Sequence, residues 1–546
     1  MVSSFLTDAL TDPTLVLHEL FQDNHNIDSF PATVSAHFSH IFRSLDAFNE
    51  IPVLNVQFPP EAHKDRSLVR FRAMVQDTST SPEMYMAKQT DSTCGGWGIG
   101  DESSTTQDQS HSEIIDYTSL RECTVIWAVT IPGECSWVVN ELDSSGPTST
   151  TKKQTTHSPS QPHKFPVPDT PHIGVQVKIY DNFRVAESLR STELRTFVGI
   201  LTSELLHGDL ETPDPPFVPT LHVLFSQPIP STLIPRTSKH LERDIRDELI
   251  TWIAEQGLGG DREAAEWVLL CTLARTQSRS PSILPLSLTL SYFPLPSLSS
   301  HSMVNTPSLL FVLSHLLPTL SVLPLSLHTL NTTSFSPESK KENLHSGWLQ
   351  LPSGSICVVT EGGVTEGGIL ERGLANLRAL QKMITSQVLE YIFPYSRFSF
   401  DTEVGFLILS EGRKSTFFQT SVNLPLKLVD TNGKEGLYKS PGEITLPPPE
   451  KLDLFRSLIG NAKVGSITIG EKVAEYIRND FVRERQAMAS TMVTGSTAGE
   501  MFGSDDLIHR MMVARLLALS LQEVEITVEI WERAKELETT RLTRLA

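Results

Sequence analysis

The spacing of apolar and polar residues changes along the chain, and the first half has two patterns. Apolar residues recur every three to four positions over residues 12–21 and 32–47, which predicts two helices. The segments that follow alternate apolar and polar residues and are rich in β-branched side chains, which predicts strands. These segments are 51–56, 68–75, 123–131, 173–180 and 195–201. Several short strands within about 150 residues predict a small β-barrel or sandwich.

Beyond residue 220 strand and helix patterns alternate. The strand candidates are 221–225, 356–359 and 404–410, and the helix candidates are 241–254, 262–273 and 370–391. This alternation predicts an α/β region with a mostly parallel sheet. The end of the chain is helical, with a pattern over 471–485 and a weaker one over 487–500. Two further helices are expected to begin at the capping residues Ser504 and Thr527.

A long segment, residues 280–337, contains no charged side chain. Its Leu-rich part, 308–327, has about the length of a membrane span, but Pro318 and Pro324 would interrupt a spanning helix. Apolar residues have strand spacing at 284–291, helix spacing at 307–317 and strand spacing again at 323–327. We therefore favour a buried βαβ unit over a membrane span.

Two polar insertions and a Pro-rich run suggest domain limits. Residues 87–112, with Trp97 as the sole aromatic, and 143–164 contain little to bury, so both are expected to be mobile loops. The Pro-rich run 212–219 is typical of a linker. The predicted order is a helical segment (1–50), a β-rich domain (51–211), a linker (212–220), an α/β domain (221–470) and a helical region (471–546).

Composition narrows the function classes. The 546 residues include 45 Lys and Arg against 64 Asp and Glu, a net charge of −19. Nucleic-acid affinity depends largely on Lys and Arg, so the charge argues against a protein that coats DNA and favours protein partners. The five cysteines are scattered without CxxC spacing, which disfavours a disulfide scaffold or a zinc module and favours a reducing compartment. The first ten residues do not resemble a secretory signal.

Nucleotide chemistry is the first activity to consider in an α/β region. A P-loop needs glycines and a lysine between a strand and a helix, but the turn 292–306 contains neither. At the end of strand 356–359, Thr360 stands where a metal-binding Asp would be, and Glu361 is interpreted as a solvated carboxylate. The Gly-rich run 361–368 has two glutamates and no lysine, so it is interpreted as a flexible turn.

Other catalytic and binding motifs are also missing. The chain has no Gly-x-Ser-x-Gly and no His-Glu-x-x-His. His18, His37 and His40 lie near the N-terminus without carboxylate or Cys partners at ligand spacing, so no metal, cofactor or catalytic residue is predicted. Arg70 and Arg72 share one face of a predicted strand and leave open an alternative, direct binding of single-stranded DNA.

In combination, several stretches resemble the mini-chromosome maintenance (MCM) complex-binding protein family. Each stretch is weak by itself, but together they cover nearly the whole chain apart from the polar insertions. They are 51–55, 68–77, 84–86, 131–137, 175–181, 197–201, 346–351, 409–413, 513–520 and 531–538.

The C-terminal half is also similar to the MCM ATPase domain, through 347–361, 379–387 and 404–410. Where MCM proteins have a sensor Asn, this chain has Ser410 and Glu411, and no Ser-Arg-Phe arginine-finger motif occurs near 425–430. The resemblance therefore implies an oligonucleotide-binding (OB)-like β-barrel followed by a degenerate AAA+ domain with a helical lid. Phosphoryl transfer needs the missing charges placed together, so we expect no enzyme activity.

The resemblance implies a nuclear, non-enzymatic replication factor that binds MCM helicase subunits. It would support assembly, chaperoning or removal of MCM complexes from chromatin, S-phase progression and sister chromatid cohesion. No cofactor, membrane or small-molecule substrate is expected. The alternatives are an unconventional AAA+-type ATPase and a binder of single-stranded DNA through the OB-like domain.

Overall fold

A computed structural model describes most of the chain. It covers residues 4–23, 26–89, 93–99, 117–143, 161–180, 188–206, 216–229, 244–296, 306–341, 343–364, 366–429, 436–493 and 503–546. The chain forms two compact units. Unit 1 comprises Met1–Ser231, Thr333–Ser353 and Val388–Thr402, and unit 2 comprises Thr232–Thr332, Gly354–Gln387 and Glu403–Ala546. The prediction of a mixed α/β multidomain protein is confirmed.

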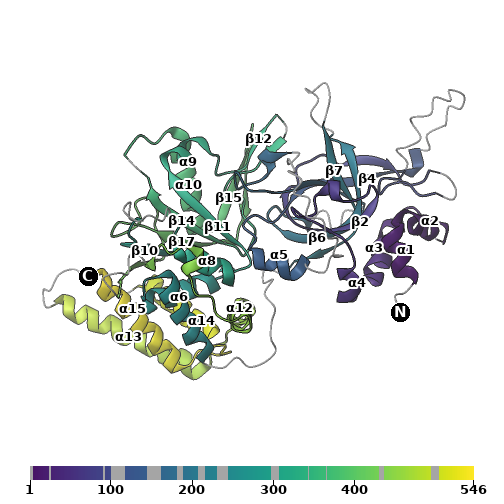
Figure 1. The fold of residues 1–546 in the computed structure, drawn as a ribbon. Coiled ribbons are helices and arrows are strands. Elements are labelled where there is room, and N and C mark those ends of the chain that lie inside the picture. The colour runs from purple at the N-terminus through teal and green to yellow at the C-terminus, as the bar shows by residue number, and fades with distance from the viewer. Residues whose placement is uncertain are drawn as a thin grey trace, which may run out of the picture. The chain divides into compact units, whose positions relative to one another are not determined.

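Unit 1 is built on a closed β-barrel (Figure 1). Its sheet has the order β1-β2-β6-β7-β5-β4-β3, and an additional pairing of β2 with β4 closes the ring β2-β6-β7-β5-β4. All pairs in the ring are antiparallel except β5 with β7. The strands are β1 Val53–Leu54, β2 Ser67–Asp77, β3 Glu83–Met86, β4 Leu120–Val129, β5 Gly174–Ile179, β6 Leu194–Leu205 and β7 Phe217–Pro228.

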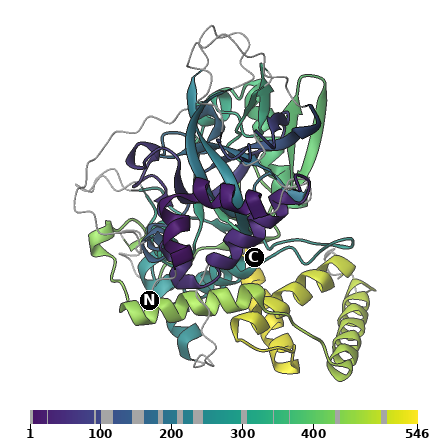
Figure 2. The ribbon, with the colours of Figure 1, turned by 90° about the vertical axis from the view of Figure 1, so that its right-hand side faces the viewer.

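Alternating side chains of the barrel strands serve two cores, as the period of two requires. Val69, Phe71 and Ala73 of β2 pack in one cluster with residues of β4, β5, β6 and β7. Leu68 belongs to a second cluster that includes Phe21 and Phe38 of the N-terminal helices. These helices, purple in Figure 2, are α1 Ser4–Thr11, α2 Pro13–Asp23, α3 Phe30–Ile41 and α4 Leu45–Asn49. A short helix, α5 Ser136–Asp143, follows β4.

Strand β7 begins inside the segment that was expected to be a linker. It pairs with β6 from Leu205↔Phe217 to Arg195↔Pro228 and with β5, so it belongs to unit 1 and not to the α/β region. Val218 and Leu221 are fully buried. Proline is tolerated in the first residues of a strand, which explains why the Pro-rich composition did not prevent pairing. Residues 207–215 lie outside the described part.

Both polar insertions contain buried residues, contrary to the expectation of mobile loops. Trp97 is 2% exposed, and its Nε1–H donates to the backbone oxygen of Val223 over 3.0 Å. The glycines on either side, Gly96 and Gly98, have positive φ and turn the segment so that this one aromatic side chain reaches the core. Lys164 is buried in an ion pair with Asp77 at 2.8 Å. Residues 90–92, 100–116 and 144–160 lie outside the described part.

Two later segments complete unit 1. They form a sheet of order β13-β12-β15-β16. The strands are β12 Glu338–Lys340, β13 Asn343–His345, β15 Val388–Phe393 and β16 Ser396–Asp401. The helix predicted over 370–391 is therefore too long: α10 is Glu371–Ser386 and ends at Gln387, whose φ of 51° is left-handed. Apolar and aromatic residues at 388–393 then continue as a strand, because that composition favours β-structure.

Unit 2 contains a five-stranded sheet of order β11-β14-β17-β10-β18, in which every pair is parallel. The strands are β10 Leu288–Ser291, β11 Leu320–Ser326, β14 Ile356–Gly363, β17 Gly405–Leu409 and β18 Val422–Pro425. The predicted strand-helix-strand order is confirmed, with α8 Ser308–Leu316 as the helix. However, β10 and β11 are not neighbours, because β14 and β17 lie between them.

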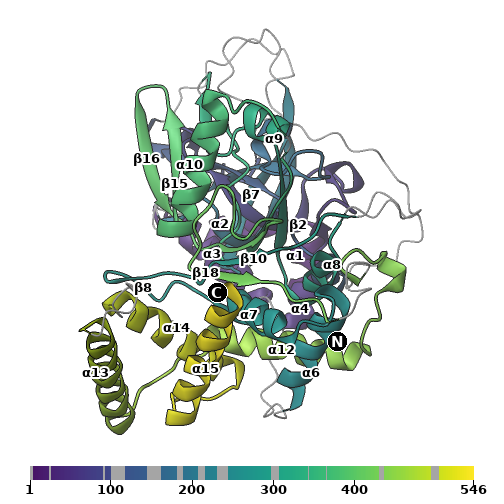
Figure 3. The ribbon, with the colours of Figure 1, turned by 90° about the vertical axis from the view of Figure 1, so that its left-hand side faces the viewer.

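Helices of unit 2 pack against this sheet or against one another (Figure 3). They are α6 Asp244–Gly257, α7 Arg262–Leu273, α9 Leu327–Thr332, α12 Pro449–Val464, α13 Glu471–Val493, α14 Ser504–Ser520 and α15 Val528–Leu545, and a small hairpin is formed by β8 Ser278–Arg279 and β9 Ser282–Ile283. The cap at Thr527 is confirmed, since its side chain accepts a hydrogen bond from Ile530 N–H. The Leu-rich segment is divided between α8 and β11. Within the described ranges, no helix is long and apolar enough to cross a membrane.

Candidate functional site

The carboxyl edge of the parallel sheet in unit 2 is the first place to examine, because ligands of open α/β sheets bind outside the carboxyl ends of the strands. The register places the ends of three strands side by side. Leu409 of β17 pairs with Leu290 of β10 and with Thr360 of β14. The missing P-loop, metal carboxylate and sensor residue would all lie here.

The turn after β10 is tied to the loop after β17 by backbone hydrogen bonds. Tyr292 N–H donates to Gly412 O over 3.0 Å, and Phe293 N–H donates to Ser410 O over 2.9 Å. Phe293 itself is 4% exposed. A phosphate cradle needs free backbone N–H groups at this position. Here backbone oxygens of the loop after β17 accept hydrogen bonds from both N–H groups. Residues 297–305 lie outside the described part.

The N-terminus of α8 is the place where a helix would bind an anion, because its first N–H groups lack intrahelical partners. Another part of unit 2 occupies it. Ser308 N–H donates to Leu437 O over 2.8 Å, and Ser308 Oγ accepts from Lys439 N–H over 2.6 Å. Between them, Tyr438 donates its hydroxyl to Pro294 O over 2.8 Å. The segment 436–440 thus takes the position that a phosphate group would need.

Glu361 is not the solvated carboxylate that the sequence suggested. It is 7% exposed and accepts hydrogen bonds from Ser415 Oγ and, over 3.1 Å, from Thr416 N–H. Ser415 Oγ also accepts from Phe418 N–H over 2.9 Å. The carboxylate therefore orders the chain between β17 and β18. A Cβ added at Gly362 would lie 2.2 Å from Leu295 Cδ2, so an apolar side chain fills the neighbouring space.

Ser410 and Arg544, two side chains at this edge, are also engaged in hydrogen bonds within unit 2. Ser410 Oγ donates to Lys414 O over 3.1 Å within its own loop. Arg544, at the end of α15, donates to Pro425 O over 3.2 Å and forms an ion pair with Asp261 at 2.6 Å. Sequence reasoning missed Arg544, because no motif marks it and more than a hundred residues separate it from both partners. Among the described residues no group of three His, Cys, Asp or Glu could hold a metal ion.

The two arginines considered for DNA binding are not available on a strand face. Arg70 is 4% exposed, donates to Asn49 Oδ1 over 3.1 Å and lies over the Phe48 ring. Arg72 forms an ion pair with Glu134 at 2.6 Å. The expectation that both are exposed is wrong. The polar side of the strand is covered by α4 and by the segment after β4, which a pattern of alternation cannot reveal.

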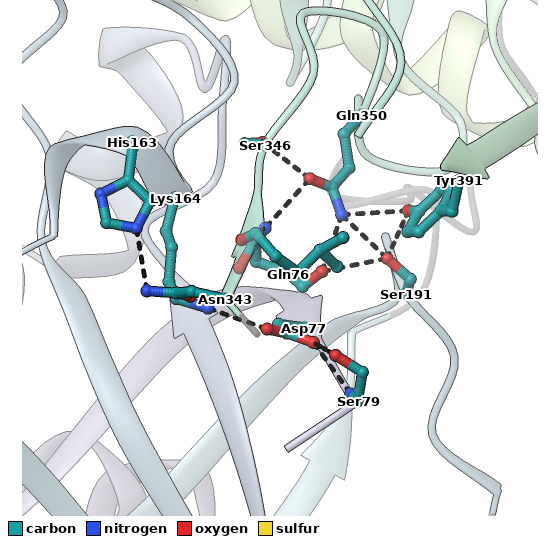
Figure 4. Close-up of polar contacts among 11 residues, drawn as sticks. Gln76, Asp77, Ser79, His163, Lys164, Ser191, Asn343, Ser346, Gln350 and Tyr391 are labelled. Carbon is teal, nitrogen blue, oxygen red and sulfur yellow. Dashed lines mark hydrogen bonds and ion pairs between the residues drawn. The ribbon is translucent and has the colours of Figure 1, made fainter. Parts of the chain in front are cut away.

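Unit 1 contains a buried polar cluster, which joins residues that are far apart in the sequence (Figure 4). Gln350 Nε2 donates to Gln76 O over 2.7 Å and to Tyr391 Oη over 3.0 Å, while its Oε1 accepts from Ser346 Oγ over 2.6 Å. Tyr391 and Gln350 are 3% and 0% exposed. The buried cluster is inaccessible to a substrate, so it attaches the later segments to β2 rather than providing chemistry.

A second buried chain of polar groups in unit 1 has the residue types of a catalytic relay. Tyr180 Oη lies 2.6 Å from His222 Nδ1, and His222 Nε2 lies 2.7 Å from Glu204 Oε1. Burial raises the pKa of Tyr180 well above its usual value. A Cβ at Gly98 would lie 3.1 Å from His222 Nε2, so the segment carrying Trp97 covers the imidazole. The tyrosine is thus shielded from any substrate and remains protonated.

The N-terminal histidines do not assemble into a metal site. His18 Nδ1 lies 3.6 Å from Cys94 Sγ. Burial lowers the pKa of His18 and of His37, so both stay neutral at physiological pH. The five cysteines are free thiols, and all are buried. Cys94 and Cys123 belong to the core between the N-terminal helices and the barrel, whereas Cys271 and Cys357 lie in unit 2.

Comparisons with known proteins give one consistent result. A family model described as "Mini-chromosome maintenance replisome factor" matches residues 38–164 and 139–545. Proteins called "Mini-chromosome maintenance complex-binding protein" are similar over nearly their whole length. The relative from Danio rerio is 26% identical (98% of this chain, 97% of the relative), that from Arabidopsis thaliana 26% identical (93% and 92%), and that from Homo sapiens 23% identical (98% and 98%).

Proposed function

This chain belongs to the mini-chromosome maintenance replisome factor family, and we propose that it binds subunits of the MCM helicase as a non-catalytic partner in DNA replication. The printed names of relatives from animals and a plant support MCM binding. Similarity that runs through both units supports a role that uses the whole chain.

We further infer that unit 2 is a degenerate AAA+-like domain. The parallel sheet supports this, as does the similarity of 347–361 to the MCM ATPase sequence. A closed ring of five strands likewise supports an OB-like barrel in unit 1. A domain with the shape of a helicase subunit can take part in contacts between subunits while its nucleotide position holds protein groups.

The proposal that this protein is non-catalytic rests on the carboxyl edge of the parallel sheet in unit 2, which other segments of the chain occupy. The segment 436–440 covers the N-terminus of α8, and the loop after β17 takes the N–H groups after β10. Phosphoryl transfer requires a phosphate cradle and cations directed at the phosphates. At this edge the described N–H groups are bound by the chain itself, and Arg544, beside the end of β18, is paired with Asp261.

The proposal also includes nuclear location and a role in the assembly or chaperoning of MCM complexes and in their removal from chromatin. It further includes support of S-phase progression and sister chromatid cohesion. These roles follow from the family resemblance. All of them require physical association with MCM subunits, so association is the first property to test.

The test is binding of the purified full-length chain to individually purified MCM subunits and to their assemblies, by affinity capture and size-exclusion chromatography. We expect a stable complex with at least one subunit. No association with any subunit at micromolar concentrations would refute the proposal.

Two further titrations test the alternatives. We expect no heat of binding with ATP and Mg²⁺ in isothermal titration, and micromolar binding would instead favour an unconventional ATPase. We also expect no salt-dependent binding of single-stranded DNA, because Arg70 and Arg72 are engaged within unit 1.

A further inference from the structure

Unit 2 has a groove between α6 and the start of α12, two helices that Figure 3 labels near one another. We call it the α6–α12 groove. It is open to solvent and has a volume of about 600 Å³, within the range of ligand-binding clefts. One wall is the exposed side of α6, and the other is the segment 445–448 with Lys451 of α12.

The floor of the groove is aromatic and rigid. The rings of Trp252 and Phe455 are stacked with centroids 6.1 Å apart. Trp252 Nε1–H donates to Thr445 O over 2.9 Å, which fixes the indole and joins the two walls. On the rim, Leu446 is 43% exposed and Pro447 and Pro448 add further apolar surface. An apolar side chain can therefore be buried here at little cost in ordering the protein.

The α6 wall is acidic. Asp244, Asp247, Glu248 and Glu255 share one side of the helix, with spacings of three, four and seven residues. Glu248 is paired with Lys451 at 2.9 Å and Asp247 lies 3.7 Å from Arg246. Among the described residues Asp244 has no ion-pair partner. Glu255 is attracted by Lys439, whose Nζ donates to the Glu255 backbone oxygen over 2.9 Å, but its carboxylate forms no ion pair there. Arg262 and Lys451 are the cations lining the groove, so it carries an excess of negative charge.

We propose that the α6–α12 groove binds a basic segment of a protein partner, in which an apolar side chain is flanked by lysine or arginine. The apolar side chain would contact Leu446 and the exposed part of Trp252, beneath which Phe455 is fully buried. The flanking cations would face Asp244 and Glu255. Nucleotides and phosphorylated peptides are disfavoured, because the acidic wall repels anions. The identification of that partner as an MCM subunit rests on the function proposed above.

The first experiment locates the partner segment. A photoreactive benzoylphenylalanine is incorporated at position 446 of the full-length chain, which is then irradiated together with purified MCM subunits. We expect a cross-link to an MCM segment that contains at least two lysines or arginines next to an apolar residue. A cross-link to an acidic or uncharged segment, or none in a complex that has formed, would overturn the proposal.

The second experiment measures the charge contribution with a matched pair of variants. D244K/E255K reverses two charges of the groove. E471K/E475K makes the same charge change on α13, also at one first-turn position and one position further along the helix. We expect the groove variant to bind MCM subunits roughly tenfold more weakly at low salt, with a smaller difference at high salt.

The outcomes separate the two proposals. Wild-type protein that binds no MCM subunit refutes the proposed function itself. If the wild-type protein binds MCM subunits and the two double variants bind them with equal affinity, only the groove proposal is refuted. If D244K/E255K fails to match the wild-type melting temperature, the neutral D244N/E255Q replaces it, with E471Q/E475Q as its control, and a loss of roughly threefold is expected.

Discussion

Glu204 is a buried carboxylate between two basic side chains of unit 1. Its Oε1 lies 2.7 Å from His222 Nε2, and its Oε2 lies 2.6 Å from Lys178 Nζ. Burial by itself would raise the pKa of Glu204, but the hydrogen bonds and charges of His222 and Lys178 outweigh it and hold the pKa at about 2. A carboxyl group whose pKa falls on folding stabilises the protein above its unfolded pKa, and that stability is lost as the pH falls toward the folded value.

Replacing Glu204 by Gln should therefore destabilise unit 1 at pH 7 by roughly 1–3 kcal/mol. The difference from wild type should shrink between about pH 4.5 and pH 2, where the wild-type carboxyl takes up its proton. Urea unfolding over this pH range measures it. A difference that is the same at pH 7 and near pH 2 would show that charge is not responsible.

Lys463 is the opposite case, a buried cation in unit 2. It is 6% exposed, and burial together with the charge of Arg275 lowers its pKa to about 8. Its ammonium group donates to Gly354 O over 3.3 Å. Because the charged form is disfavoured in the fold, the cost is complete below pH 8 and is relieved as the pH rises toward the unfolded value of 10.5.

The Lys463→Met variant should consequently be more stable than wild type at pH 7, by roughly 1–3 kcal/mol. The advantage should shrink as the pH rises from about 8 to 10.5 and disappear above about pH 11.5, where lysine is neutral in both states. Chemical unfolding at the two pH values tests it, with Lys472→Met on the exposed side of α13 as the control. A variant less stable than wild type at pH 7 would mean that the bond to Gly354 outweighs desolvation.

At the scale of elements, α15 is fixed at its last turn. Arg544 binds both carboxylate oxygens of Asp261, at 2.6 Å and 3.0 Å, and lies 2.8 Å from Glu263. Asp261 also caps α7, by accepting from Ala264 N–H over 3.1 Å, and accepts from Lys427 N–H over 2.8 Å. One carboxylate thus joins the start of α7, the chain after β18 and the C-terminal helix.

Arg544→Met should cost roughly 2–4 kcal/mol, because it leaves the 3%-exposed Asp261 without its cation. Adding Asp261→Asn should restore part of this loss, since asparagine still caps a helix and carries no charge. Arg533→Met, at a half-exposed ion pair, should cost less than about 1 kcal/mol. Hydrogen exchange of α15 and thermal melting measure the series. Equal effects of the Arg544 and Arg533 changes would contradict this account.

At the scale of the whole molecule, unit 1 is assembled from three stretches of sequence. Strand β7 pairs with β5 and β6 although the Pro-rich run precedes it. Gln350 reaches Gln76 from far along the chain and also donates to Tyr391. The chain passes between the two units after Ser231, Thr332, Ser353, Gln387 and Thr402. A cut in the Pro-rich run therefore does not separate two independent halves.

A protease site placed within residues 207–215 tests this organisation. After cleavage the two pieces should co-elute in size-exclusion chromatography, because β7 stays paired with β5 and β6. They should separate only in denaturant, and the uncut chain provides the reference profile. Separation under native conditions would show instead that the chain divides at the Pro-rich run.

Much of the element order could be predicted from the sequence. The helix over 262–273 and the cap at Thr527 were predicted correctly, because helix periodicity and caps are local signals. Residues 388–393 form a strand but were predicted as part of a helix. Helix α10 ends at Gln387 in a left-handed conformation, which residue propensities do not predict. The absence of a P-loop could also be determined from the sequence, since that motif is short. What fills its place could not, because Leu437 and Lys439 contact α8 from more than a hundred residues away.

The sequence by itself determined the family, the α/β character and the absence of nucleotide motifs, because these depend on local residue types and their order. Only the tertiary structure decided where charges lie. Glu361, Arg70 and Lys164 were expected on strand faces or in loops, yet each is buried against a partner distant in sequence. Burial is a property of the assembled chain, since it depends on which distant segments pack together, and no local pattern contains that information.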